Sequence, residues 1–178
     1  MQEVLEIGDK IDFDAGVENH FAVTFLPLDI FDDWERGGKM ANFIAEYFRP
    51  EFGDEESLNL ISTVSNELIE NAVKFSKNNS TPVELTIRKR GGALLIRAEN
   101  SIPRHRRESF LATCKELFES DLEELYLRRI EESFDDPESS QIGLILMKKD
   151  YDTQIQFEFL TDENQGNRVA VTLELAVK

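Results

Sequence analysis

Two pairs of segments in this chain alternate apolar and polar residues, and the members of each pair are separated by a turn that contains glycine. In the first pair, residues 82–89 and 93–99 flank the turn 90–92. In the second pair, residues 153–161 and 168–177 flank a longer turn. Alternation indicates strands with one buried face, and a glycine turn joins two such strands into an antiparallel hairpin. We therefore expect the chain to build its core on a largely antiparallel sheet.

Helical periodicity fills the intervals around these hairpins. Four segments are expected to be helical: 29–48, 54–76, 104–134 and 142–149. The pair Gly37 and Gly38 predicts a weak point in the first of them. Asp54 is the expected N-cap of the second. Ser120 followed by Glu123 forms a capping-box pattern, which divides the third into two helices.

Two further strands are expected in the N-terminal part. Residues 20–28 are rich in β-branched and aromatic types, and residues 4–7 are expected to pair with them. The order of elements predicts an α+β fold, a two-layer sandwich in which a mixed, mostly antiparallel sheet is covered on one face by helices. We expect a single domain over residues 1–178.

Charge and cysteine content limit the classes of function. The chain has 20 Lys plus Arg against 36 Asp plus Glu, a formal charge of −16. Such a surface repels phosphates, so we expect neither nucleic acid nor an anionic membrane as a partner. The single cysteine, Cys114, cannot form an internal disulfide, and the first residues lack a positively charged signal region. A soluble, cytoplasmic protein is expected.

The 54–76 helix carries a polar face of unusual content. Glu67, Asn71 and Lys74 follow one another at i, i+4 and i+7, which places them on one side of the helix. A carboxylate, an amide and an ammonium in one row could orient water, hold a hard cation through oxygen and contact a phosphate. The alternative is a helix face that is simply solvated.

The phrase NELIENAVKFS, residues 66–76, resembles the N box of the GHKL superfamily. That superfamily of ATP-binding domains includes histidine-kinase catalytic domains, gyrase-type and Hsp90-type ATPases, and anti-sigma serine kinases. The resemblance implies the Bergerat-type ATP-binding fold, with ATP and Mg²⁺ as cofactors. It also implies that Asn71 is the metal ligand, that Glu67 is the catalytic base and that Lys74 approaches the phosphates.

Two further segments lie where the family has its glycine boxes. At the first, D-x-G-x-G in the family, this chain has Glu99 and Asn100, which the resemblance implies as cofactor-binding residues. Ser101 and Pro103 stand in place of the two glycines, so the backbone lacks the freedom that allows close approach to a nucleotide. The alternative for Glu99 is a solvated carboxylate at the end of a strand.

The second glycine box, G-x-G-L-G-L in the family, corresponds to residues 139–146. Here the resemblance implies that Ser140 and Gly143 hold phosphates at the start of a helix. The alternative is an ordinary turn from loop to helix. The resemblance implies that the helical residues 104–134 stand in place of the ATP lid. Such an insert could cap the pocket, occupy it, present a groove to a partner, or simply pack as a solvated helical pair.

The resemblance implies a stand-alone ATP-binding regulatory protein, closest in size to the anti-sigma serine kinases. It would act as a Mg-ATP-dependent serine/threonine kinase on a regulatory protein partner, a sigma-like factor or its antagonist. Too few residues precede the expected domain for a phospho-accepting helix, so a complete sensor histidine kinase is not expected. The alternative is a nucleotide-independent interaction module on the same fold, which the altered glycine boxes favour. Whether the chain forms a homodimer stays open.

Overall fold

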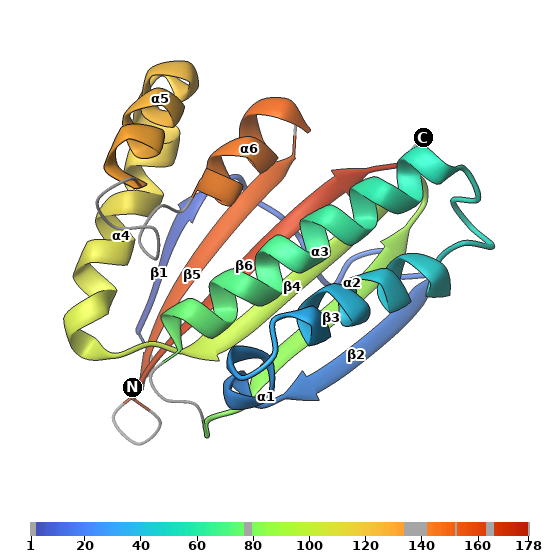
Figure 1. Cartoon of the computed structure of the whole chain (residues 1–178), viewed down its shortest axis with the longest axis horizontal. Helices are drawn as coiled ribbons and strands as arrows, with labels where there is room; N and C mark the ends of the chain where they lie inside the picture. The colour runs from blue at the N-terminus through green and yellow to red at the C-terminus, as the bar shows by residue number, and fades with distance from the viewer. Residues whose placement is uncertain (1–2, 77–79, 134–141, 152, 163–165, 178) are drawn as a thin grey trace.

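The computed structural model describes residues 3–76, 80–133, 142–151, 153–162 and 166–177. Figure 1 shows two layers, a twisted sheet and a set of helices on one of its faces. In chain order the elements are β1 (Glu3–Gly8), β2 (Asn19–Phe25), α1 (Pro27–Phe31), α2 (Glu35–Tyr47), α3 (Glu55–Phe75), β3 (Val83–Arg90), β4 (Ala93–Ser101), α4 (Arg104–Glu119), α5 (Leu122–Ser133), α6 (Ile142–Asp150), β5 (Gln154–Asp162) and β6 (Gly166–Ala176).

The six strands lie in the order β1-β5-β6-β4-β3-β2, and every neighbouring pair is antiparallel. This confirms the α+β two-layer fold and both hairpins. The predicted pairing of residues 4–7 with 20–28 is wrong, because β1 pairs with β5 and β2 pairs with β3. The two strands form opposite edges of the sheet. Their connection, residues 9–18, is long enough to cross the sheet, so no tight turn forces them together.

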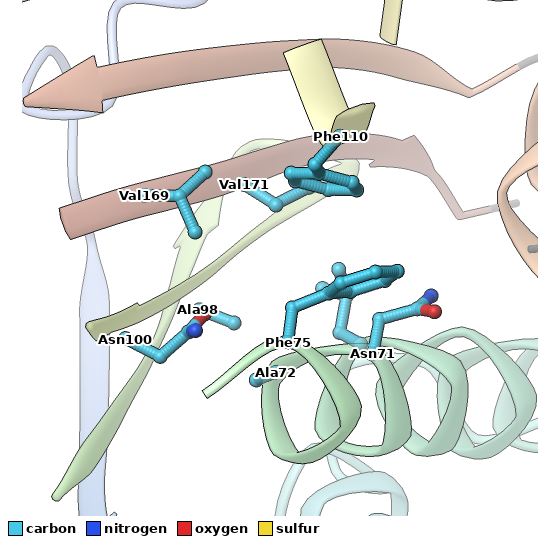
Figure 2. A pocket seen from close by; sticks show the side chains of 9 residues that line it. Asn71, Ala72, Phe75, Ala98, Asn100, Phe110, Val169 and Val171 are labelled. Carbon is cyan, nitrogen blue, oxygen red and sulfur yellow. The ribbon is translucent and has the colours of Figure 1, made fainter. Parts of the chain in front are cut away.

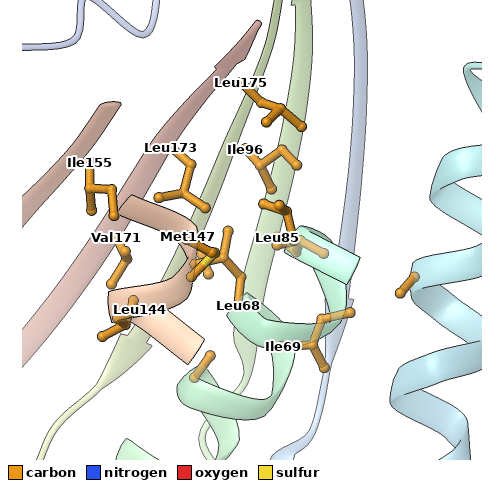
Figure 3. Close-up of a cluster of buried hydrophobic side chains, with 14 of the residues drawn as sticks. Leu68, Ile69, Leu85, Ile96, Leu144, Met147, Ile155, Val171, Leu173 and Leu175 are labelled. Carbon is orange, nitrogen blue, oxygen red and sulfur yellow. The ribbon is translucent and has the colours of Figure 1, made fainter. Parts of the chain in front are cut away.

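The core lies between the sheet and α3 and α6. Leu68 of α3 points toward Leu85 of β3 and Ile96 of β4, whereas Ile69 points toward α2, and all four are fully buried (Figure 3). Burial of one such side chain stabilises the fold by about 1.5–3 kcal/mol. This packing fixes the rotation of α3 about its axis, and with it the direction of the polar face.

The helical expectations are confirmed with two corrections. The segment 29–48 breaks at residues 32–34 between α1 and α2, where the Asp33 carboxylate accepts from the Glu35 amide (3.2 Å). Gly37 does not mark a break, because it lies buried inside α2 and faces α3, where an added Cβ atom would come within 3.5 Å of Ile69. Helix α5 is capped by Asp121, not Ser120, since the Asp121 carboxylate accepts from the two amides at 123 and 124.

The face of the sheet opposite the helices is polar. Residues 9–18 cross this face, and the Phe13 carbonyl accepts from Nη1 of Arg88 (2.9 Å) while its ring lies 4.3 Å from the same guanidinium. Arg97 forms an ion pair with Glu158 on the same face. Within the described ranges we find no helix with the length and hydropathy of a membrane-spanning segment.

Candidate functional site

Helix α3 carries the predicted polar row of Glu67, Asn71 and Lys74. Its N-cap and its packing against the sheet fix its position. Asp54 is its N-cap, as predicted, and accepts from the Ser57 amide (2.8 Å). Packing of the apolar stripe against the sheet directs Glu67 toward α6 and leaves Asn71 at the border of the core. The row is thus not a fully solvated face.

Glu67 lies against the first turn of α6. A Cβ atom at Gly143 would overlap the Glu67 carboxylate, so this close approach requires glycine. Among the described residues the carboxylate has no hydrogen-bond or ion-pair partner. Burial raises the pKa of Glu67, the nearby Glu70 carboxylate raises it further, and the Lys74 ammonium opposes both. The structure therefore brings together Glu67 and Gly143, two residues predicted for the same site.

Asn71 is buried, with 7% of its surface exposed. Its Nδ2 atom has no hydrogen-bond partner in the part of the chain that the structure describes. A buried polar group without a partner costs about 1–3 kcal/mol, so such groups mark places where a ligand or water completes the bonding. Asn71 also lines a small cavity between α3 and the sheet, together with Asn100 of β4.

This cavity is almost filled by aromatic rings. Its volume is about 10 Å³, near the minimum for one water molecule. Phe110 of α4 stacks on Phe75 of α3 with ring centroids 4.4 Å apart and meets Phe157 and Phe159 at 6.0 and 5.8 Å. Figure 2 shows the two stacked rings between α3 and the strands. Pockets for small ligands have volumes of about 300–1,000 Å³, so a nucleotide base enters here only if Phe110 moves.

Lys74 is held on the α2 side of α3. Its ammonium pairs with Glu70 (3.6 Å) and lies 6.0 Å from the ring centroid of Trp34. Its carbonyl accepts from Nη1 of Arg106 on α4 (2.8 Å). The ammonium is thus engaged by Glu70 and Trp34; it acts on Glu67 through its charge, and no contact joins it to Gly143 among the described residues.

The register of β4 corrects the prediction for Glu99. This carboxylate lies on the polar face of the sheet, where it pairs with Arg168 and with Arg97 (3.8 Å). Successive residues of a strand point to opposite faces, so Asn100 points to the helix side, where it is 3% exposed and its amide donates to the Ser101 carbonyl (3.1 Å). Glu99 is separated from Asn71 by the sheet, and only Asn100 faces the cavity.

The second predicted glycine box is described in part. Gly143 is the second residue of α6, as expected for a turn that opens a helix. Ser140 lies outside the described residues.

Sequence reasoning did not assign Phe110 to the site. Its place on the apolar stripe of residues 104–134 indicated burial but not the surface against which it is buried. Of the roles left open for the helical insert, occupation of the pocket is the one that the Phe110–Phe75 stack matches.

A solved structure resembles this chain over most of its length. A chain in the crystal structure of the SiaB–SiaC complex from Pseudomonas aeruginosa aligns with a TM-score of 0.61 at 12% sequence identity, over 90% of each chain. No protein-family model matches the sequence, and no curated protein matches it. At 12% identity the similarity shows the fold alone: the chain has the α+β fold of a protein in that complex.

Proposed function

We propose that this protein is a regulatory protein that binds Mg-ATP between α3 and α6 and phosphorylates a serine or threonine of a protein partner. One observation carries the proposal: a half-buried carboxylate, Glu67, lies against Gly143 in the first turn of α6, one helical turn from Asn71, whose Nδ2 has no partner among the described residues. A structural helix face has no need of that combination. The N-box pattern of residues 66–76 gives it a chemical meaning.

The residues present fit the phosphate end of such a ligand. The Asn71 amide oxygen would hold Mg²⁺, and the backbone amides of the first turn of α6 would hold phosphate oxygens. The bound nucleotide would supply the phosphoryl group. Glu67 would take the proton of the partner's hydroxyl at its carboxylate, and a pKa raised by burial makes the carboxylate a better base. The part of the site that would hold the adenine ring of the nucleotide would open by movement of Phe110.

The fold similarity supports a protein partner. The similar chain was crystallised in a complex named for two proteins, SiaB and SiaC. We infer that this chain, too, acts on another protein, and that a sigma-like factor or its antagonist is the class to test first.

A second function is favoured by one specific observation. The cavity beside Asn71 has a volume of only about 10 Å³, because Phe110 and Phe75 fill it. A protein that never binds nucleotide would keep such a core permanently closed. The second candidate is therefore an interaction module that recognises its partner without nucleotide.

Isothermal titration calorimetry with ATP, in Mg²⁺ and then in EDTA, separates the two functions. We expect Mg²⁺-dependent binding that is lost in Asn71→Ala, because that variant lacks the oxygen that would hold the metal. The fold is expected to survive, since Asn71 Nδ2 makes no hydrogen bond within the described residues. Asn66→Ala is the matched control, because the Asn66 amide is already bonded to Glu70 (2.8 Å). Equal binding by Asn71→Ala and wild type would remove Asn71 from the site.

The variant Gly143→Ala tests the contact between α3 and α6. The new Cβ would overlap the end of the flexible Glu67 side chain, so we expect the carboxylate to move into water and the fold to persist. The pKa of Glu67, measured by NMR titration, should fall toward its ordinary value, and phosphorylation should decrease. The control is Gly38→Ala, whose new Cβ meets no atom within 4 Å. An unchanged pKa of Glu67 in Gly143→Ala would contradict the contact.

A further inference from the structure

Helices α2 and α3 lie side by side over one half of the sheet (Figure 1). Between them runs an open groove with a volume of about 350 Å³, and Glu67 lies on its wall. Because the Glu67 carboxylate also meets Gly143 of α6, the groove adjoins the candidate site. None of the phosphate-binding groups proposed above explains this groove.

Gly38 of α2 lines the groove. A Cβ atom at Gly38 would meet no heavy atom within 4 Å, so no packing contact requires glycine there. Its neighbour Gly37, by contrast, is buried against Ile69. Glycine in the middle of a helix is unfavourable relative to alanine. Gly38 therefore leaves a space above α2 that a longer side chain would fill.

The walls of the groove offer groups that recognise peptides. Trp34 lines the groove, and 40% of its surface is exposed. Its ring centroid lies 6.0 Å from that of Phe31, which is also exposed. Tryptophan is enriched among the residues that contribute most of the binding energy at protein interfaces. Hydroxyl and amide groups of Ser62 and Asn42 line the groove and bond to each other (2.6 Å). Such groups can exchange their bonds for those of a peptide backbone.

The charge of the groove determines whether a positively or a negatively charged ligand would bind there. Glu67 and Glu70 line it, and Lys74 forms an ion pair with only one of them, Glu70. The protein as a whole carries a formal charge of −16. Both facts favour a cationic segment and disfavour an acidic one.

We propose that the groove between α2 and α3 binds an extended segment of the protein partner in which a serine or threonine lies next to lysine or arginine. Trp34 would hold an apolar side chain of the segment, and the hydroxyl would lie toward Glu67. This proposal rests on the proposed function and names the partner segment that the same site would act upon.

The fluorescence of Trp34 tests the proposal directly, because it is the only tryptophan in the chain. The blocked heptapeptide LRRASLG is titrated into the whole protein without nucleotide, and the charge-reversed peptide LEEASLG is the ligand control. We expect a saturable change in Trp34 emission with the basic peptide and none with the acidic one. Gly38→Leu, which fills the groove, should weaken binding about tenfold, whereas Gly38→Ala should bind like the wild type.

A second blocking variant guards against misfolding of the first. Thr63→Leu fills the groove from the exposed face of α3, and it should have the same effect as Gly38→Leu. No saturable signal, an equal response to LEEASLG, or binding unaffected by both blocking variants would overturn the proposal. Failure here with intact Mg-ATP binding would reject the groove alone. Peptide binding without Mg-ATP binding would keep the groove and reject the kinase.

Discussion

Replacement of Phe110 by alanine is expected to destabilise the protein by roughly 3–5 kcal/mol and at the same time to strengthen ATP binding. The ring is 2% exposed and stacks on Phe75, so its removal leaves a cavity next to Asn71. If ATP binds only after the Phe110 ring has moved out, the free energy of ATP binding to the wild type is reduced by the cost of that movement. In Phe110→Ala there is no ring to move, so this cost is absent. Each 1.4 kcal/mol of that cost strengthens the apparent affinity about tenfold. Urea unfolding and calorimetry with Mg-ATP measure the two effects.

Phe118→Ala is the matched control for Phe110→Ala. Phe118 lies on the same helix and meets Phe157 at 6.4 Å, but it does not line the cavity beside Asn71. We expect some loss of stability and no change in ATP affinity. Phe110→Leu keeps most of the buried volume and serves if the alanine variant fails to fold. Folded Phe110 variants that bind ATP no better than the wild type would favour the nucleotide-independent module.

Glu67→Gln is expected to make the protein more stable at neutral pH and to lower phosphorylation of the partner about 10²–10⁴-fold. The pKa of Glu67 is raised by burial and by Glu70. The folded state then binds this proton more tightly than the unfolded state, so the free energy of unfolding falls as pH rises from 4.5, the ordinary value, through the raised pKa. Glutamine has no such titration. The free energy of unfolding of Glu67→Gln is thus expected to exceed that of the wild type at neutral pH but not in acid.

Urea unfolding of Glu67→Gln and wild type across this pH range checks the sign. The control is Glu70→Gln, which loses the ion pair with Lys74 while it relieves Glu67 of one repulsive charge, so its gain in stability at neutral pH should be smaller than that of Glu67→Gln. A difference between Glu67→Gln and wild type that stays constant with pH would show that the carboxylate is not destabilised by burial. Undiminished phosphorylation would exclude Glu67 as the base.

The parts of the fold that could be predicted depend on short-range signals. Alternation in residues 82–99 and the 3.6-residue period of α3 are local, and both were predicted. The partner of β1 could not be predicted, because it depends on how residues 9–18 cross the sheet. The break after α1 was misplaced because Gly37, taken as a helix breaker, is a packing residue.

In the candidate site, too, the features with a local sequence signal could be predicted, and those that depend on distant contacts could not. Glu67 and Asn71 were singled out by their residue types and spacing, and Gly143 by the resemblance of its segment to a glycine box; all three signals are visible in sequence. Glu99 was placed one residue out of phase with the pleat of β4, because a motif match does not say which face a strand residue takes. The stack of Phe110 on Phe75 joins two helices that are far apart in the chain, and periodicity cannot pair them.

The position of β1 has a consequence for synthesis. Glu3 pairs with Thr161 and Gly8 with Gln156, so β1 finds its partner strand only after the much later β5 has been made. Closing so long a loop is slow and entropically costly. Until then the apolar edge of the nascent sheet is open to other chains. The synthesis of the β5–β6 hairpin, and not the folding of α1 to α3, therefore decides when this side of the sheet is closed to other chains.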